Sequence, residues 1–276
     1  MATSPDNLPG DHSTLNPHRQ LHRWGFGLVL VATLALCWIP HFDLAAENHL
    51  SGLLADNLIV YGTARVINAL ISVIQSVEIS LSLGAGIAVN LGEALDPLND
   101  LIERFSGFLL YGLAGLGIQQ IALTASSSLL AKITTSLVCL SGFVVWYRTG
   151  DIPSWLRRLI LPFILIRFAF IAEVGLAWSL DKLYFNEQQA VAASTLNGTR
   201  QQLQIVRDKY VNATEDTSIF TNVWESARGI IGTDDQQGIA DQAAGAIVQL
   251  IVILFLRSIL LPAAFFWLLI HLITRR

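Results

Sequence analysis

Three ionisable residues inside long apolar stretches are the strongest candidates for chemistry in this sequence. Arg167, Glu173 and Arg257 each interrupt a run of hydrophobic residues that is long enough to cross a bilayer. A charge at membrane depth costs a few kcal/mol, so such a residue usually faces a protein interior or water and has a partner. We therefore expect these side chains to lie inside a helical bundle, where they either form ion pairs or line an aqueous pathway.

Helix geometry pairs two of these residues. Glu173 lies 15 residues after Arg158, about 22 Å along a helix, and Arg257 lies 18 residues before Arg275, about 27 Å. On antiparallel spans these heights are similar, so the sequence predicts an intramembrane charge pair between Glu173 and Arg257. Pro262 lacks a backbone N–H, which predicts a kink in the last span just after Arg257.

Two expected helices carry narrow polar stripes on otherwise apolar surfaces. The stripe residues recur at three-four spacing, as Arg65, Asn68, Ser72 and Gln75 on the first helix and as Gln120, Thr124, Ser127 and Thr134 on the second. Such a stripe either makes hydrogen bonds to a neighbouring helix or lies along water. Both alternatives stay open, and the candidate lining of a pathway comprises the stripe residues up to Ser127 together with Arg167.

The histidines and cysteines do not form a recognisable metal or redox motif. His41, Asp43 and His49 stand near one another after the first apolar run, but their spacing is looser than that of metal-site motifs. Cys37 and Cys139 each lie in an apolar run without a second cysteine nearby, so no disulfide framework is expected. We expect no metal-binding residue and no cofactor.

The familiar catalytic templates are missing from the sequence. There is no GxSxG, HExxH or phosphate-binding lysine loop, and the glycine-rich stretch Gly112–Gly117 lies in an uncharged apolar run. Small residues in such a run are typical of close helix packing. The sequence therefore predicts no catalytic and no cofactor-binding residue, and the chain is not expected to be an enzyme.

The composition predicts an all-α integral membrane protein. Of its 276 residues, 53% are hydrophobic and only 14% are charged, whereas charged residues make up roughly 25% of ordinary soluble domains. The net charge of −4, without a large basic patch, argues against a nucleic-acid partner. Roughly 20 apolar residues are needed to cross a bilayer. Six stretches could do so, namely 24–40, 57–77, 105–127, 128–147, 159–180 and 243–271.

Basic residues set the expected orientation in the membrane. Arginines flank the short loop 148–158, Arg23 precedes the first apolar run, and Arg276 closes the sequence. The positive-inside tendency places this loop and both termini in the cytoplasm. We expect a multi-pass protein of a bacterial inner (plasma) membrane. A signal peptide cleaved after Ala46 is the alternative to a retained first span.

Two topologies satisfy this orientation, because an odd number of crossings must occur between residues 41 and 148. In the four-span topology, 105–147 is one long helix whose second half crosses the membrane. In the six-span topology, 57–77 also crosses, and 105–147 forms a hairpin that turns near Thr124–Ser128. We favour four spans.

Two outer segments separate the spans in this topology. Residues 41–104 should contain an amphipathic helix and then a small β-hairpin at about 77–91, because apolar residues alternate with polar ones around a glycine pair. Residues 181–241 should be a helical extracytoplasmic segment that packs along one seam. The seam residues are Leu196, Leu203, Val206 and Tyr210.

The expected order of segments follows from these assignments. It comprises a disordered cytoplasmic tail at 1–23, spans at 24–40 and 159–180, the outer segment 41–104, a long helix or helical hairpin with a transmembrane part at 105–147, the cytoplasmic loop 148–158, the outer segment 181–241 and a last span with a cytoplasmic end at 242–276.

The leading functional hypothesis is a self-associating membrane protein that forms a channel or permeation pathway. Polar stripes and intramembrane charges need a polar surround, which a pore within a homo-oligomer supplies. The alternative is a structural or accessory scaffold of an envelope complex, without transport or catalytic activity of its own. In that case a partner protein from the envelope docks through residues 186–240. The lipid bilayer is the expected environment in both.

Overall fold

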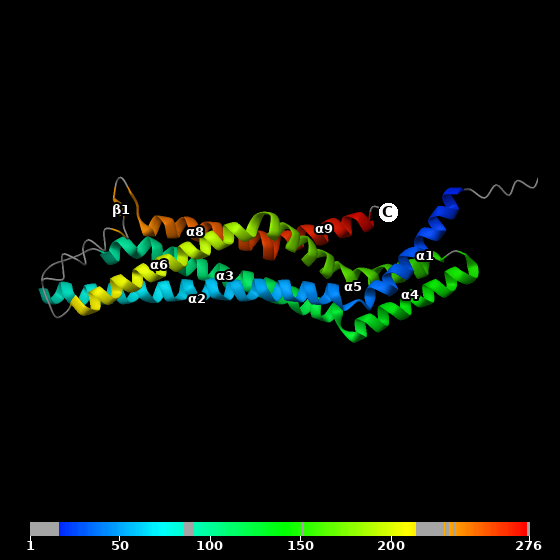
Figure 1. Ribbon diagram of the computed structural model, residues 1–276, viewed down its shortest axis with the longest axis horizontal. Coiled ribbons are helices and arrows are strands. Elements are labelled where there is room, and N and C mark those ends of the chain that lie inside the picture. The colour runs from blue at the N-terminus through cyan, green and yellow to red at the C-terminus, as the bar shows by residue number, and fades with distance from the viewer. Residues whose placement is uncertain are drawn as a thin grey trace, which may run out of the picture. The chain divides into compact units, whose positions relative to one another are not determined.

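The computed structural model describes residues 17–85, 91–150, 152–213, 229, 232–233 and 236–274, and within them the chain is helical almost throughout (Figure 1). The elements are α1 (Pro17–Cys37), α2 (Pro40–Ala85), α3 (Leu91–Ser127), α4 (Leu129–Thr149), α5 (Ser154–Leu180), η1 (Asp181–Phe185), α6 (Asn186–Ala213), β1 (Gly232–Thr233), β2 (Gln236–Gln237), α8 (Ile239–Phe255), η3 (Leu256–Leu260) and α9 (Leu261–Thr274). The two short strands pair antiparallel. Because η1 and η3 are π-helical and keep helical backbone angles at both ends, α5–η1–α6 and α8–η3–α9 are each continuous.

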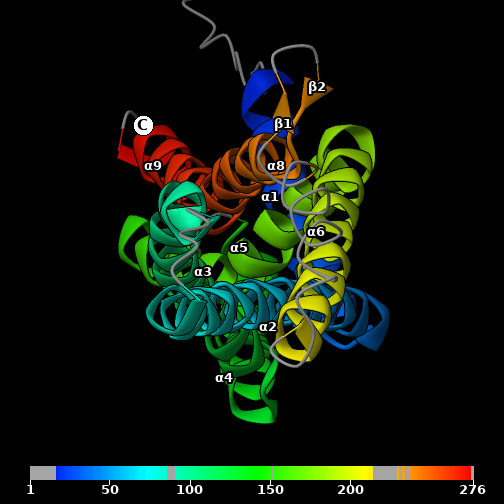
Figure 2. The same cartoon turned by 90° about the vertical axis from the view of Figure 1, so that its left-hand side faces the viewer.

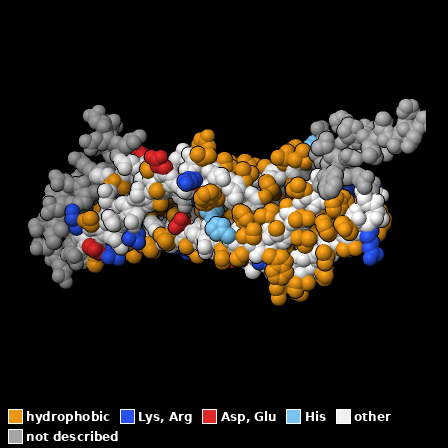
Figure 3. All heavy atoms as spheres, turned by 45° about the vertical axis from the view of Figure 1, so that its right-hand side comes forward, with side chains coloured by type: hydrophobic (Ala, Val, Ile, Leu, Met, Phe, Trp, Pro, Cys, Tyr) orange, Lys and Arg blue, Asp and Glu red, His pale blue; other side chains and the backbone are white. Residues whose placement is uncertain are grey.

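Five described helical stretches are long and apolar enough to cross a membrane. They are Pro40–Ser76, Leu95–Ser127, Leu129–Thr149, Ser154–Lys209 and Ile239–Thr274. Large hydrophobic side chains are widely exposed, and Figure 3 shows them covering much of the face that it draws. Apolar surface of this extent is typical of contact with a membrane or another protein. The prediction of a helical multi-pass membrane protein is confirmed at this level.

The chain forms two compact units. The first comprises residues up to His41 together with Ser126–Phe168, and it contains α1, α4 and the first part of α5. The second comprises Phe42–Ala125 and Ala169–Arg276, and it contains α2, α3, α6 and α8. We call them the three-helix unit and the four-helix unit.

In the three-helix unit, α1 runs antiparallel to α4. Near one end of the pair, a Cβ at Gly27 would lie 2.7 Å from the indole ring of Trp146, so only glycine permits this approach. Near the other end, the indole N–H of Trp38 donates to Ser136 Oγ at 3.1 Å. The core of the unit consists of Leu30, Cys139, Ile152, Leu156 and Ile160.

In the four-helix unit, the buried residues follow a heptad pattern. On α2 they alternate at three-four spacing from Leu50 to Ile74, and on α3 from Leu95 to Leu123. This spacing corresponds to 3.5 residues per turn, the period of helices that pack in a left-handed coiled coil. Figure 2 shows α2, α3, α6 and α8 arranged around a common axis. The seam predicted for residues 181–241 is buried at Leu196, Leu203 and Val206 of α6.

Two polar contacts fix the register of the α2–α3 hairpin. Gln75 donates to Asp96 at 2.6 Å, and Gln120 donates to Ser51 at 3.3 Å. The two α2 residues are 24 positions apart, and so are their two α3 partners. The helices therefore lie side by side, antiparallel and without slippage, over about 36 Å.

The predicted β-hairpin at about 77–91 is wrong. Helix α2 continues through Ala85, residues 86–90 lie outside the described part of the chain, and α3 begins at Leu91. The alternation of Val77, Ile79 and Leu81 with polar residues resembles a strand. However, these residues extend a helix that is already formed, and adding one turn to a helix is far easier than nucleating a new element.

One other boundary also differs from expectation, and segment 105–147, for which a long helix and a helical hairpin were both open, contains a break. Residues 17–23, predicted to be part of a disordered tail, belong to α1, whereas 1–16 lie outside the described residues. Segment 105–147 is two helices rather than one, because Ser128 ends the first and caps the second, its Oγ accepting from the N–H of Ala131 at 3.3 Å. The break falls where the six-span topology expected a turn.

Candidate functional site

A buried ion pair joins the two π-helical segments of the four-helix unit. Asp181 is the first residue of η1, and Arg257 lies in η3. The Nε of Arg257 contacts Oδ1 of Asp181, and the side chains are only 3% and 1% exposed. A π-helical turn inserts an extra residue into a helix and is frequent at functional positions. Here it occurs on both helices where the opposite charges meet.

The guanidinium of Arg257 is surrounded by polar groups from the start of α6. Its two terminal nitrogens donate to Gln189 Oε1 and, at 3.2 Å, to Asn186 Oδ1. The ring of Phe185 lies 5.6 Å from the guanidinium carbon. Charge, hydrogen bonds and an aromatic face together offset the cost of removing this cation from water.

His49 of α2 completes the cluster. Its Nε2 lies 3.0 Å from Oδ2 of Asp181, and the contact is ionic only when the imidazole is protonated. The two oxygens of the Asp181 carboxylate thus contact Arg257 and His49, one each. The Asp181–Arg257 pair by itself has no net charge.

A further polar contact lies beside the cluster, on α3. Pro262 has no N–H, so the carbonyl of Ser258, four residues earlier, lacks its helical partner. The side chain of Gln119 donates to this carbonyl at 3.2 Å. The approach is close, because a Cβ at Gly115 would lie 3.2 Å from the same oxygen. The segment where the kink was predicted is the π-helical η3, and Gln119 contacts it.

Glu173 does not form the predicted pair with Arg257. It is fully buried on α5, and neither of its carboxylate oxygens has a hydrogen-bond partner in the described part of the chain. The arginine contacts Asp181 instead, eight residues further along the same continuous helix. The height argument considered only charges inside the apolar runs, whereas Asp181 was assigned to the outer segment. Its position at the end of the run, two turns from Glu173, is the signal that was missed.

Arg167 belongs to the three-helix unit. Its side chain is 1% exposed, a terminal nitrogen donates to the carbonyl of Cys37 at 3.4 Å, and the guanidinium carbon lies 5.3 Å from the ring of Phe168. As expected for a charge in an apolar run, it faces the protein interior.

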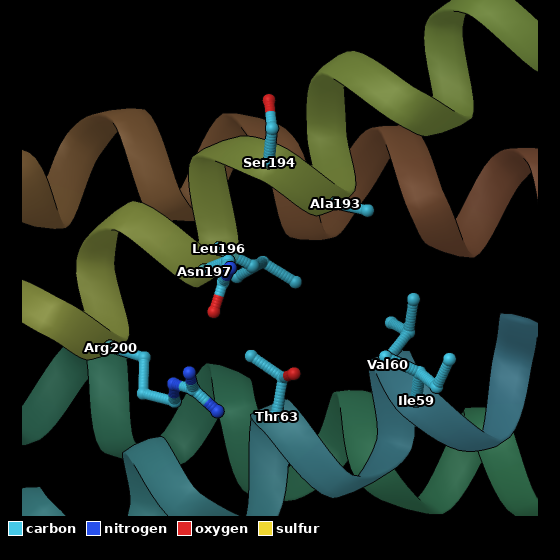
Figure 4. Close-up of a pocket in the computed structure, with 8 residues that line it drawn as sticks. All are labelled: Ile59, Val60, Thr63, Ala193, Ser194, Leu196, Asn197 and Arg200. Atoms are coloured by element: carbon cyan, nitrogen blue, oxygen red, sulfur yellow. The ribbon is translucent and has the colours of Figure 1, made fainter.

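The stripe residues divide into two groups. Gln75 and Gln120 bridge α2 and α3, as described above, so their amides serve helix contact. Arg65, Ser72 and Thr124 are exposed, Asn68 and Ser127 are half-buried, and the Ser72 hydroxyl donates to the Asn68 carbonyl at 3.0 Å. A groove of about 400 Å³ between α2 and α6 contains none of them (Figure 4). It is lined by Ile59, Val60, Thr63, Ala193, Ser194, Leu196, Asn197 and Arg200.

The sequence predicted no metal site, although His41 and Asp43 stand close together in it. Among the described residues, no three side chains of the metal-ligating types converge. His49 faces Asp181 rather than these two residues, while Asp43 is buried. The geometry thus offers a charge cluster that joins three helices, α2, η1 and η3.

Fold and site together are compatible with a helical protein of the multi-pass membrane class, with a buried charge cluster that joins α2 to two continuous helices. The chain matches no protein-family model, no curated protein and no solved structure in the comparisons. Function is therefore argued from the geometry alone.

Proposed function

We propose that the protein is a structural scaffold of a bacterial inner membrane, in which four spans anchor a rigid helical bundle on the outer side. The observation that carries this proposal is the length of the heptad-packed helices. Helix α2 has 46 residues, about 69 Å, whereas the hydrocarbon of a bilayer is roughly 30 Å thick. The continuous stretch Ser154–Lys209 is longer still. Helices of this length extend well beyond the lipid.

Chain directions support four spans. In the three-helix unit, Leu30 of α1 and Ile160 of α5 both lie next to Gly142. Seven residues further along each helix, Arg167 of α5 contacts Cys37 of α1. Because both contacts advance in the same direction, α1 runs parallel to α5. Helix α4 is antiparallel to α1 and therefore to α5. If α5 crosses the membrane outward, α1 also crosses outward and α4 crosses inward.

The same reasoning applies within the four-helix unit. Helix α2 meets η1 at His49 and α6 at Thr63, which lines the groove with Asn197, so α2 runs in the direction of α5–η1–α6. Helix α3 is antiparallel to α2. In the proposed topology, the α2–α3 hairpin leaves in the outward direction of α6 and returns without crossing the membrane.

The polarity of the helices agrees with this arrangement. The arginines that begin and end the loop 148–158 are exposed at the end expected to be cytoplasmic. Helix α6 exposes Glu187, Gln188, Gln202 and Asp208, which water accommodates and hydrocarbon does not. In this assignment α1, α4, α5 and the η3–α9 segment are the spans, and α2, α3, α6 and α8 form the outer bundle.

A permeation pathway is the second candidate, and it is less well supported. The stripe residues Gln75 and Gln120 are engaged between helices, and the core of the four-helix unit is filled by apolar side chains. Arg65 is exposed, so a pathway lined by it would have to form between copies of the chain.

Solute flux separates the two candidates. In liposomes, purified folded protein should give no flux of ions or small solutes above that of empty liposomes. Flux through the wild-type protein would contradict the scaffold if Arg65→Glu changed the preference of that flux for anions or cations. The reason is that a ring of arginines favours anions. Arg104→Glu is the matched control, since it reverses another exposed arginine on the neighbouring helix.

A further inference from the structure

The exposed surface of α3 changes its chemistry near Phe105. Before this position the helix exposes the charged residues Asp96, Asp100, Glu103 and Arg104. After it, the exposed side chains include Phe108, Tyr111 and Ile118, at 53%, 73% and 68%. The sequence has no charged residue from Phe105 to Ala131. A surface this apolar needs a cover other than water.

Helix α8 continues this apolar surface. It lies against α3, because a Cβ at Gly112 would overlap the side chain of Leu254 and one at Gly115 would touch the backbone of Ser258. On its outward side α8 exposes further hydrophobic residues at similar heights. The α3/α8 face, as we define it, comprises Phe108, Tyr111 and Ile118 with Val248, Val252 and Phe255.

Charged side chains are exposed on α2 and α6 at the same height, beside exposed apolar residues such as Leu58 and Ile59 of α2. The contacts between α2 and α3 fix which of their residues lie at the same height. Asp56 of α2 is level with Gly115 of α3, and Arg65 is level with the residues just before Gly107. Both side chains are exposed, as is Glu187 at the start of α6. Lipid around this part of the bundle would surround these charges with hydrocarbon, at a cost of several kcal/mol. A bilayer is therefore a poor cover, and a protein partner on the apolar side is a good one.

We propose that a second copy of the chain covers the α3/α8 face. This inference rests on the outer bundle of the proposed function, and it names the partner of that bundle. Copies in one membrane share one orientation, so a two-fold axis along the membrane normal brings the same face of both together. The face extends over about 15 Å of α3 and two helices in width, on the order of 450–600 Å² per copy, which is near the lower end of specific interfaces.

Two isoleucines provide a matched test of this interface. Ile118 of α3 and Ile59 of α2 are both 68% exposed, but only Ile118 lies on the α3/α8 face. In lipid nanodiscs of inner-membrane composition, mass measurement should find the full chain as a dimer or a multiple of it. Ile118→Glu should weaken self-association by at least about tenfold, because it buries a charge in an apolar contact. Ile59→Glu should leave the mass unchanged.

A second pair of variants keeps the proposal testable if glutamate disturbs folding. Tyr111→Cys in a chain without Cys37 and Cys139 should be cross-linked between copies by a bifunctional maleimide in membranes, and Ile59→Cys should not. A monomeric wild-type protein, or equal cross-linking of both variants, would overturn the proposal. So would quenching of a fluorophore at position 118 by brominated lipid, which would assign the face to the bilayer. None of these outcomes affects labelling of the outer bundle, which tests the scaffold separately.

Discussion

Replacing Asp181 with asparagine should lower the stability of the protein by about 3–5 kcal/mol, because the change leaves the buried Arg257 without its counter-charge. Arg257→Gln should have a similar effect, since among the described residues Asp181 would then keep only His49 as an ionic contact. The double variant Asp181→Asn/Arg257→Gln should regain much of the loss, because neither helix then buries a lone charge. Thermal unfolding in mild detergent, followed by tryptophan fluorescence, measures the stability of all three variants relative to the wild-type protein.

Glu173→Gln is the matched control for this cycle. It also changes a buried carboxyl to an amide on the same continuous helix, but neither Glu173 oxygen has a hydrogen-bond partner within the described residues. Its effect on stability should therefore be small or favourable, because no ion pair is broken. Losses that add up in the Asp181/Arg257 double variant, or a Glu173→Gln loss as large as that of Asp181→Asn, would mean that the charges are paired differently.

Gly115→Leu should destabilise the protein by about 1–3 kcal/mol through overpacking at the α3–η3 contact. Even the first carbon of a side chain there would lie 3.2 Å from the carbonyl oxygen of Ser258. That oxygen belongs to the backbone and already accepts from Gln119, so the helices themselves must separate.

Gly117→Leu provides the comparison, because outside the backbone of its own helix no atom of the described residues lies within 4 Å of a Cβ at that position. It adds the same side chain two residues further along the same helix and should be neutral or stabilising, since leucine favours helix by about 1 kcal/mol over glycine. Thermal unfolding of the two variants under identical detergent conditions measures the difference. Equal midpoints would show that α3 and η3 do not approach as closely as the structure places them.

Periodicity made the helical class and the packing seams predictable. A three-four pattern of apolar residues is a local property, and it correctly indicated burial of Leu196, Leu203 and Val206. The glycine-rich stretch was interpreted as helix packing, and the close approaches at Gly112 and Gly115 agree with that. The β-hairpin failed because alternating residues at the end of a long helix cannot be distinguished from a strand by spacing alone.

The candidate site was less predictable, because its partners meet only after folding. Asp181, Asn186 and Gln189 follow one another on a continuous helix, yet their common partner Arg257 lies far away in the sequence. The prediction paired Glu173 with Arg257 from their heights along the helices alone. Height does not determine which side of a helix a residue lies on. Which face of each helix points inward depends on the two π-helical turns, and each of these changes the helical phase after it.

The most direct test of the outer bundle is labelling of single cysteines from one side of the membrane. In a chain without Cys37 and Cys139, Ser72→Cys on α2 and Gln202→Cys on α6 both occupy exposed positions, and so does Ser154→Cys within the basic loop 148–158. A membrane-impermeant maleimide applied to intact spheroplasts should label positions 72 and 202, and it should reach position 154 only after the membrane is permeabilised. Protection of position 72 with labelling of 202 would replace four spans with six. Protection of position 202 would contradict the outward direction of α5–η1–α6, and with it the scaffold.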